Sequence, residues 1–331
     1  MFYATAAGVG LKTGPAIRCL AGDGAIFHCC KRSARLCYVF SVPPTKTAPS
    51  TRETAFSKGN PMAADSIPAI VEADASGETA AVFADIRTTL GLPVVNLVWR
   101  HLATIPDGLE WTWTALKPFY VSGAIGRAAG SFLSQQEFAA PMKLSSACLA
   151  SANIAAADLA VIRAIIDSYH RGNAMNIIAL SLPRLSGNVA PAQLTSAALP
   201  EVAKLTIPAL PALDGLPAAH RDLVLELNAL GKHADDPVVA SLYRHLAPWP
   251  GLLSLSAVLL QPLNASGQLA AMMAEADQLA NAHAAAISAE IGGIDVADVP
   301  AGVTAALDRF TENVIARMVP ICGILRTTLA I

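Results

Sequence analysis

An arginine followed directly by a histidine occurs twice in this chain, as Arg100-His101 and as Arg244-His245. A guanidinium presents a planar fork of donors that can bind a carboxylate through two parallel hydrogen bonds. Histidine is the side chain that most readily gains or loses a proton near neutral pH. Two such pairs facing each other across a cleft would hold a small carboxylic acid beside a general base. The alternative, which we favour, is that the pairs are structural ties between two similar parts of the chain.

Two adjacent aspartates, Asp235 and Asp236, directly precede Pro237. A carboxylate within hydrogen-bond reach of a water molecule can act as a general base. The competing interpretation is a polar turn before a helix, where aspartate commonly accepts backbone N–H bonds. We favour the turn.

Two uncharged polar residues, Asn173 and Ser241, stand in apolar surroundings. A buried amide at Asn173 needs a hydrogen-bond partner, which is either a bound carboxylate or a nearby backbone carbonyl. Ser241 either contacts a ligand or bonds back to its own helix. Trp99 and Tyr243 occupy equivalent positions beside the two Arg-His pairs, and aromatic residues there belong more often to the core than to a ligand cradle.

Cys148 and Cys322 are isolated cysteines with apolar neighbours, so we expect both to be buried and unreactive. The chain beyond residue 61 has no CxxC pair, which excludes a disulfide reductase. No GxGxxG, P-loop, HExxH or GxSxG motif occurs. His283 lies on an apolar helical face and is expected to be a core histidine. We predict no metal site and no cofactor.

The segments around the two Arg-His pairs repeat each other. Residues 93–118 align with residues 237–262 at a constant offset of 144, and the matches include two adjacent valines and both Arg-His-Leu-Ala runs. A self-match of this kind indicates a duplicated domain rather than a solenoid. A duplicated chain can fold like a two-fold dimer within one polypeptide. The expected site is then the cleft between the copies.

Apolar residues at helical spacing predict the elements that position these side chains. Steps of three and four residues occur over 82–90, 159–169, 223–230 and 269–287, and a last helix is expected over about 300–328. Glycine is common just beyond the end of a helix, and Gly91, Gly231 and Gly292 occupy such positions. We expect Gly172-Asn173 to interrupt the second of these helices.

The predicted fold is all-α, with two internally duplicated helical repeats that form a pseudo-dimer. We expect the first repeat at residues 62–190 and the second at 218–331. A proline-rich linker at 191–217 separates them, because prolines at this density exclude a long helix.

Composition limits the classes of function. The chain has 331 residues, of which 53% are hydrophobic and 15% charged, and its net charge is −2. Such a composition can bury a large core and favours helix. The small net charge gives no global field for binding nucleic acid. No apolar run of 18 residues occurs, so we expect no transmembrane helix.

The first 61 residues differ from the rest of the chain. They contain eight basic and two acidic residues, a net charge of +6 that leaves about −8 for the remainder, and four of the six cysteines. This extension is a disordered basic tail, a transit-like peptide, or a sequence upstream of a true start at Met62. We favour the last. A metal site from its cysteines and His28 would lack the paired CxxC spacing.

Several stretches resemble, in order, the group I 2-haloacid dehalogenases, an all-helical family that acts on D- and L-2-haloacids. The stretches are Asp74-Ala-Ser-Gly-Glu78, Asp85-Ile-Arg-Thr-Thr-Leu90, Leu102-Ala-Thr-Ile-Pro106, Tyr169-His-Arg-Gly-Asn173 and Trp249-Pro250. They cover the chain from about residue 68 onward. The resemblance implies a pseudo-dimer of two helical repeats related to the AhpD-like fold, in agreement with the internal repeat.

The resemblance also implies a reaction. In this family an aspartate activates a water molecule, which attacks C2 of the haloacid directly and inverts its configuration without a metal or cofactor. Such chemistry needs a general base, donors for the substrate carboxylate and a close apolar cradle for the halide.

The family's site residues map only in part onto this chain. The family asparagine falls on Asn173, and the serine before the catalytic aspartate falls on Ser241. The aspartate itself falls on Leu242. A family tryptophan falls on Val94, and a family tyrosine falls near Leu307.

Because Leu242 cannot act as a base, the candidate substitutes are Asp235, Asp236 and His245. The candidate substrate-binding residues are those at or beside the matched positions, namely Asn173, Ser241, Leu242, Val94, Arg244 and Tyr243.

Two functions therefore compete. The first is a 2-haloacid dehalogenase-like hydrolase that cleaves a carbon–halogen bond in a small 2-halo carboxylic acid. The second is a non-catalytic homologue that binds small carboxylic acids and lacks the base. We expect a cytoplasmic monomer or homodimer with no nucleic acid or membrane partner.

Overall fold

The computed structural model describes residues 67–138, 142–185, 207–233 and 236–329, together with 19–21 and 25–27. The chain divides into two compact units, Met1–Lys58 and Gly59–Ile331. In the first unit, β1 (Cys19–Ala21) pairs antiparallel with β2 (Ala25–Phe27). The rest of the basic extension, including His28 and the neighbouring cysteines, lies outside the described residues.

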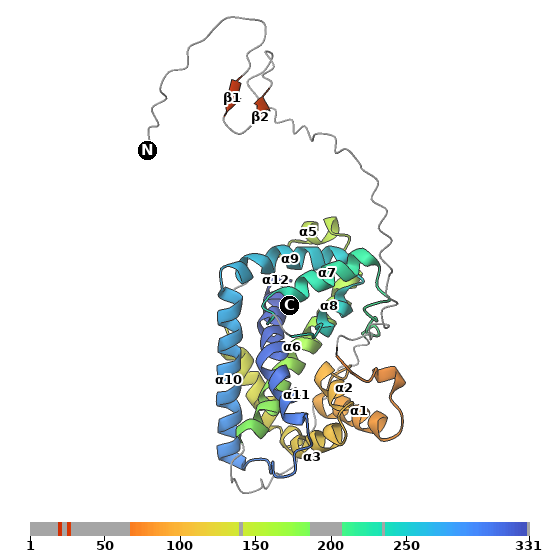
Figure 1. The fold of residues 1–331 in the computed structure, drawn as a ribbon, viewed down its shortest axis with the longest axis vertical. Helices are drawn as coiled ribbons and strands as arrows, with labels where there is room; N and C mark the ends of the chain where they lie inside the picture. Colours follow the sequence, from red (N-terminus) through yellow and green to blue (C-terminus); the bar gives the residue numbers. More distant parts are fainter. Residues whose placement is uncertain are drawn as a thin grey trace, which may run out of the picture. The chain divides into compact units, whose positions relative to one another are not determined.

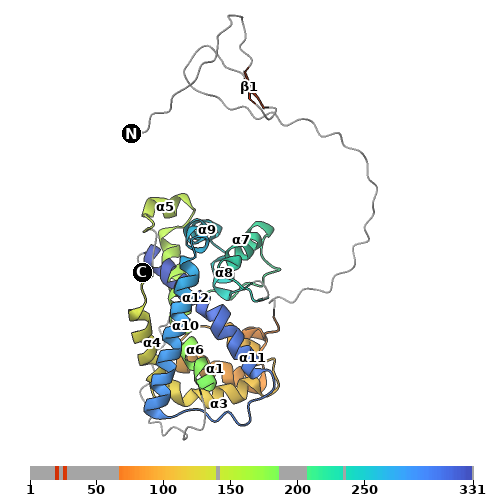
Figure 2. The same ribbon diagram turned by 60° about the vertical axis from the view of Figure 1, so that its left-hand side comes forward.

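The second unit is built from helices, as predicted (Figures 1 and 2). The elements are η1 (Glu72–Asp74), α1 (Gly77–Leu90), α2 (Leu97–Leu102), α3 (Gly108–Val121), α4 (Ala124–Gln135), α5 (Ser146–Ser151), α6 (Ala156–Leu185), α7 (Ala218–Ala229), α8 (Ser241–Leu246), α9 (Pro250–Ala265), α10 (Gln268–Ile291), α11 (Val303–Arg309), η2 (Phe310–Ile315) and α12 (Ala316–Thr328). None of the described helices is long and apolar enough to cross a membrane.

Glycines end three helices where the sequence predicts it. Gly91 follows α1 with a φ of 62°, Gly231 lies two residues beyond α7 with a φ of 65°, and Gly292 follows α10 with a φ of 95°. These left-handed conformations are unfavourable for side chains with a Cβ, so glycine closes the helices at low cost.

The predicted interruption at Gly172-Asn173 is wrong, because α6 continues through both residues. A Cβ on Gly172 would lie 2.9 Å from Leu92 Cδ1 and 3.1 Å from Asn96 Oδ1. The glycine therefore serves the close approach of a neighbouring segment and does not break the helix. Packing outweighs its weak helix propensity.

The last predicted helix is present over its expected extent but is not uniform. Between α11 and α12, the segment η2 is π-helical. Such segments are rare and occur often at functional sites. Here Phe310, Val314 and Ile315 of η2 line a cavity.

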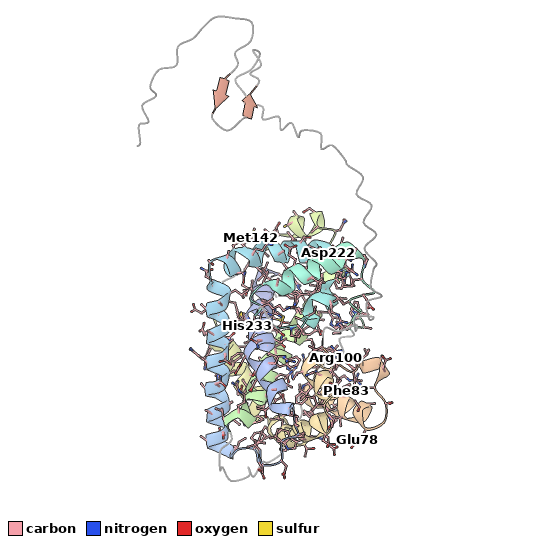
Figure 3. The ribbon with its side chains drawn as sticks, viewed as in Figure 1. Glu78, Phe83, Arg100, Met142, Asp222 and His233 are labelled. Carbon is pink, nitrogen blue, oxygen red and sulfur yellow. The ribbon has the colours of Figure 1, made fainter. Side chains whose placement is uncertain are left out.

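Two hydrophobic cores lie within the second unit, and each contains residues from both predicted repeats. Phe83 and Trp99 belong to the first core, and Tyr243 and Leu260 to the second. The long helices α6, α10 and α12 pack against one another and contribute to both cores (Figure 1). Figure 3 shows Phe83 and Arg100 on the neighbouring helices α1 and α2.

Candidate functional site

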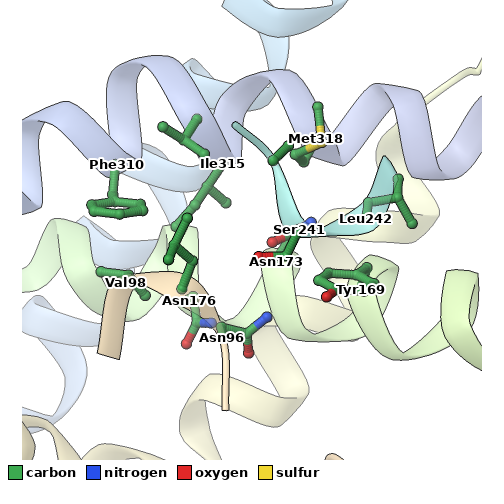
Figure 4. A pocket seen from close by; sticks show the side chains of 13 residues that line it. Asn96, Val98, Tyr169, Asn173, Asn176, Ser241, Leu242, Phe310, Ile315 and Met318 are labelled. Atoms are coloured by element: carbon green, nitrogen blue, oxygen red, sulfur yellow. The ribbon is translucent and has the colours of Figure 1, made fainter. Parts of the chain in front are cut away.

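A small cavity lies where α2, α6, α8, η2 and α12 meet (Figure 4). The empty space at this site is about 380 Å³ when adjoining solvent is included, and about 30 Å³ is open to the centres of water-sized molecules. Its polar lining residues are Asn96, Tyr169, Asn173, Asn176 and Ser241. Its apolar lining residues are Leu97, Val98, Ala240, Leu242, Phe310, Val314, Ile315 and Met318. We call this space the asparagine cavity.

The hydrogen bonds of Asn176 fix the orientation of its amide. Its Oδ1 accepts from Trp99 Nε1 at 3.2 Å and from Tyr120 Oη at 3.0 Å. Because the indole nitrogen can only donate, the oxygen must face these two groups and the NH₂ must face away from them. Asn176 Nδ2 is a buried donor with no hydrogen-bond partner among the described residues. A buried donor of this kind is available to a ligand or a water molecule.

Asn173 lies one helical turn before Asn176 and is 6% exposed. Its Nδ2 approaches Cys322 Sγ at 3.9 Å, a weak interaction. Burial raises the pKa of the Cys322 thiol to about 12, so this thiol is protonated and unreactive near neutral pH. Cys322 is buried as predicted, whereas Cys148 is half-buried, contrary to expectation.

Ser241 is the first residue of α8 and reaches two groups from other elements. Its Oγ accepts from Arg100 Nη2 at 3.3 Å. Burial raises the pKa of Tyr169, and a side-chain hydrogen bond with Ser241 lowers it in part. Ser241 therefore bonds to α2 and α6 rather than back to its own helix.

Tyr169 connects the asparagine cavity to His245. Its hydroxyl lies 2.7 Å from His245 Nδ1, and His245 Nε2 lies 3.0 Å from the carbonyl oxygen of Pro208. Since a carbonyl can only accept, Nε2 carries the proton and Nδ1 accepts from the tyrosine. Burial lowers the pKa of His245, the guanidiniums of Arg244 and Arg100 lower it as well, and the bond to Pro208 opposes them, with a result of about 4.

The two histidines of the Arg-His pairs make similar contacts. His101 Nδ1 lies 2.7 Å from the carbonyl oxygen of Pro68, and His245 bonds to the carbonyl of Pro208. Both prolines stand in an Ile-Pro-Ala segment that precedes the corresponding helix of its half. Neither contact joins the two predicted repeats. The bonds between the repeats that involve these pairs are those of Arg100 to Ser241 and of Tyr169 to His245.

The two arginines of these pairs differ in their hydrogen-bond acceptors. Arg244 donates through Nε and Nη2 to the carbonyl oxygen of Pro211, at 2.9 and 2.6 Å. Arg100 reaches Ser241 at the asparagine cavity. Burial lowers the pKa of both guanidiniums, to about 10 for Arg244. Both remain cationic near neutral pH, so they place positive charge close to the Tyr169–His245 pair.

A second, larger cavity is also lined by Tyr169 and has about 470 Å³ open to the centres of water-sized molecules. His245, Arg244, Arg100 and Val94 line it. Glu72 lies there too, ion-paired with Arg87 and accepting from the backbone N–H of Val95 at 3.0 Å. Val94, the position of the family tryptophan, thus faces this space and not the asparagine cavity.

The aspartates named as substitute bases lie elsewhere. Asp236 Oδ1 accepts from the backbone N–H of Val238 at 3.0 Å, as the turn interpretation predicts, and Asp236 lines neither cavity. Asp235 lies outside the described residues. Leu242 lines the asparagine cavity, and no carboxylate is among the described residues around it.

Two other predicted positions belong to the cores. Tyr243 and Leu307 are buried in the second and first cores, respectively, and neither lines the asparagine cavity. Phe310, three residues beyond Leu307, lines the cavity instead. Among the described residues, no group of three or more His, Cys, Asp and Glu side chains could hold a metal ion.

Sequence reasoning did not identify Tyr169, Asn176 and Phe310 as residues of the cavity. Tyr169 stands on a predicted apolar helical face, and Asn176 lies within an apolar run. Asn176 follows Asn173 by three residues, which places both amides on one face of a helix. That spacing was the signal available for Asn176.

The all-α fold of this chain is similar to that of solved D-2-haloacid dehalogenases. A solved D-2-haloacid dehalogenase mutant in complex with D-2-CPA matches 80% of this chain and 96% of its own, with a TM-score of 0.61 and 16% identity. A D-2-haloacid dehalogenase in complex with L-LA matches 79% of this chain and 96% of its own, with the same TM-score and identity.

Sequence similarity points to the same family over a short stretch. An (R)-2-haloacid dehalogenase from Pseudomonas putida is 46% identical over 55 residues, which are 16% of this chain and 18% of that protein. The aligned stretch thus spans less than a fifth of that relative. No protein-family model matches the chain. The chain resembles the haloacid dehalogenase family both in fold and in this stretch.

Proposed function

We propose that this protein is a 2-haloacid dehalogenase-like hydrolase that binds a small 2-halo carboxylic acid in the asparagine cavity. The observation that carries the proposal is the meeting of Asn173, Ser241 and Leu242 around one cavity. The family resemblance assigns site residues to these three positions, which lie on two helices far apart in the sequence. A relative of shared fold acts on 2-haloacids, as its name states.

The cavity offers groups suited to each part of such a substrate. Asn176 Nδ2 is a donor free to bind a substrate oxygen. Ser241 Oγ accepts a hydrogen bond from Arg100, so the positive guanidinium lies directly behind the serine. Both would stabilise a carboxylate. The ring of Phe310 and the side chain of Val98 form an apolar surface for the halogen (Figure 4). In the proposed reaction, water displaces halide at C2 and a 2-hydroxy acid results. The proposal includes a cytoplasmic location and no cofactor.

The first test is halide release by the full-length protein with D- and L-2-chloropropionate and 2-bromopropionate. The expected result is release of chloride or bromide from at least one of the enantiomers. The variant Leu242→Asp, which places a carboxylate where the family has its base, is assayed beside it. Absence of halide release by the wild type would contradict the proposal, and the result for Leu242→Asp then shows whether the pocket lacks only a base.

A second candidate function is a binding protein for small carboxylic acids that does not turn them over. Leu242 favours this candidate, because it puts an apolar side chain where the family's base is expected. This candidate predicts that short carboxylic acids raise the melting temperature without release of halide. Halide release by Leu242→Asp alone would support it, since the pocket would then lack only a base.

A further inference from the structure

Four side chains and one carbonyl form a hydrogen-bonded chain that starts at the asparagine cavity. Arg100 Nη2 donates to Ser241 Oγ at 3.3 Å, and Ser241 and Tyr169 line the same cavity. Interaction with the Ser241 hydroxyl lowers the pKa of Tyr169, which places that hydroxyl as a donor toward the Tyr169 oxygen. Tyr169 lies 2.7 Å from His245 Nδ1, and His245 Nε2 lies 3.0 Å from the carbonyl oxygen of Pro208. The chain thus links a residue that lines the cavity to a basic nitrogen behind it.

The two ends of this chain fix its direction. Arginine has no acceptor, so the Ser241 oxygen receives its hydrogen bond and keeps its own proton to donate to Tyr169. Pro208 offers only a carbonyl, so His245 keeps its proton on Nε2 and presents a bare Nδ1 to the Tyr169 hydroxyl. Every proton in the chain therefore points from the cavity toward His245 Nδ1. A proton entering at Ser241 can reach that nitrogen by successive transfers of one proton each.

We propose that Ser241, Tyr169 and His245 form a proton relay that takes the place of the missing aspartate at Leu242. This inference rests on the proposed function. A water molecule against Ser241 Oγ attacks C2 of the haloacid, the new C–O bond forms, and the C–halogen bond breaks with its electron pair on the halide. The water's proton passes to Ser241, the serine proton to Tyr169, and the tyrosine proton to His245 Nδ1. The products are a 2-hydroxy acid, a halide ion and a protonated His245.

The strength of the final acceptor is suited to this role. The pKa of His245 is about 4, close to the ordinary value of an aspartate. The imidazole is therefore neutral near pH 7 and ready to accept, as a family aspartate would be. His245 also lines the second cavity, whose 470 Å³ has room for several water molecules. These water molecules can accept the proton from His245 and so regenerate the neutral imidazole.

The test separates proton transfer from packing by comparing turnover with substrate binding in the full-length protein. Tyr169→Phe removes only the hydroxyl, and His245→Gln keeps an acceptor and a donor but cannot take up a proton. Loss of general-base assistance is expected to lower halide release by about 10²–10⁴-fold. The dissociation constant for 2-chloropropionate, measured by calorimetry, should change by no more than about threefold.

His101→Gln is the matched control. His101 is also buried and bonded to a proline carbonyl, but it has no link to Ser241. This variant should keep halide release within about threefold of the wild type. The double variant Tyr169→Phe with Leu242→Asp should recover activity, because the introduced carboxylate makes the relay unnecessary.

The outcomes distinguish failure of the relay from failure of the proposed function. Wild-type turnover that survives both Tyr169→Phe and His245→Gln would overturn the relay and leave the dehalogenase function standing. Equal loss of binding and turnover in Tyr169→Phe would show a structural role and overturn the relay as well. An inactive wild type with an active Leu242→Asp would overturn the relay in favour of the binding function. If His245→Gln does not fold, Tyr169→Phe alone decides.

Discussion

Asn176 illustrates how one residue can serve both stability and binding. Its oxygen accepts from Trp99 and Tyr120, which belong to the first core, while its buried nitrogen has no partner among the described residues. Asn173, on the same helix face, has among the described residues a weak contact of its Nδ2 with Cys322 Sγ at 3.9 Å. The amide of Asn176 therefore contributes hydrogen bonds to the core, whereas the amide of Asn173 contributes little to stability.

Replacing each amide with leucine should reveal this difference. Asn176→Leu leaves two buried donors without an acceptor, at a cost of roughly 1–3 kcal/mol each. Asn173→Leu should change the free energy of unfolding by only about 1 kcal/mol. Urea denaturation of both variants and the wild type measures these values. Equal destabilisation by the two substitutions would show that the hydrogen bonds from Trp99 and Tyr120 to Asn176 contribute no extra stability.

Buried histidines make stability depend on pH. Burial lowers the pKa of His170 and His245 to about 4, helped by Arg326 for His170 and by Arg244 and Arg100 for His245. The unfolded chain takes up these protons near pH 6.5, whereas the folded chain does so only near pH 4. The free energy of unfolding should therefore be highest above pH 6.5 and decrease as the pH falls to about 4.

The expected loss over this window is about 3 kcal/mol per histidine. Urea denaturation at pH 7.5 and at pH 4.5 tests it, with His245→Gln as the comparison. The variant should lose less stability than the wild type between the two pH values. A wild type and variant with parallel pH profiles would refute the assignment of His245 as a neutral buried imidazole.

At the scale of elements, α6 positions most of the polar groups of the site. Tyr169, Asn173 and Asn176 follow one another along this helix at steps of four and three residues. Gly172, between them, allows Leu92 and Asn96 to approach the helix closely. That approach places Asn96 at the edge of the asparagine cavity, so the glycine shapes the site without touching a ligand.

Alanine at Gly172 should therefore be unfavourable, although alanine is the better helix former. The added Cβ would meet Leu92 and Asn96 at 2.9–3.2 Å, and crowding of this kind costs about 1–3 kcal/mol. The matched control is Gly126→Ala in α4, where an added Cβ meets nothing within 4 Å and helix propensity should add up to about 1 kcal/mol. Thermal and urea denaturation of both variants show whether each substitution raises or lowers the free energy of unfolding. Stabilisation by both would contradict the close approach at Gly172.

At the scale of the whole molecule, the two cores share their long helices. Met175 and Ile287 belong to the first core, and Ile162 and Met273, on the same two helices, belong to the second. Loss of one core would leave half of α6 and half of α10 without packing. We therefore expect residues 59–331 to unfold in a single cooperative transition.

Truncation in either core should lower that same transition. Phe83→Ala in the first core and Leu260→Ala in the second should each cost about 2–5 kcal/mol. Near-UV and far-UV circular dichroism, followed through urea denaturation, should give coincident curves for both variants. A second, earlier transition in only one variant would mean that the cores unfold separately.

The internal duplication remains a prediction at this scale. Several features recur at the offset of 144 found in the sequence. The helices α2 and α8 each span six residues, and Gly123 and Gly267 precede α4 and α10 with φ values of 76° and 78°. The bonds from His101 and His245 to proline carbonyls are a further parallel. All of them are consistent with a pseudo-dimer.

The sequence by itself determined the helical class, the ends of three helices and several of the segments from which the site is built. Local signals suffice for these features, because apolar spacing and terminal glycines act within a few residues. The family resemblance directed attention to Asn173, Ser241 and Leu242. It could not tell which neighbours these residues would meet.

Tertiary structure alone decided the rest. The Tyr169–His245 bond joins residues 76 apart in sequence, and the Arg100–Ser241 bond joins residues 141 apart. The same holds for Gly172, where the partner segment and not the local pattern decides that the helix continues. Such pairings depend on how whole helices pack around the two cores, and helix packing is set by side chains distant in sequence.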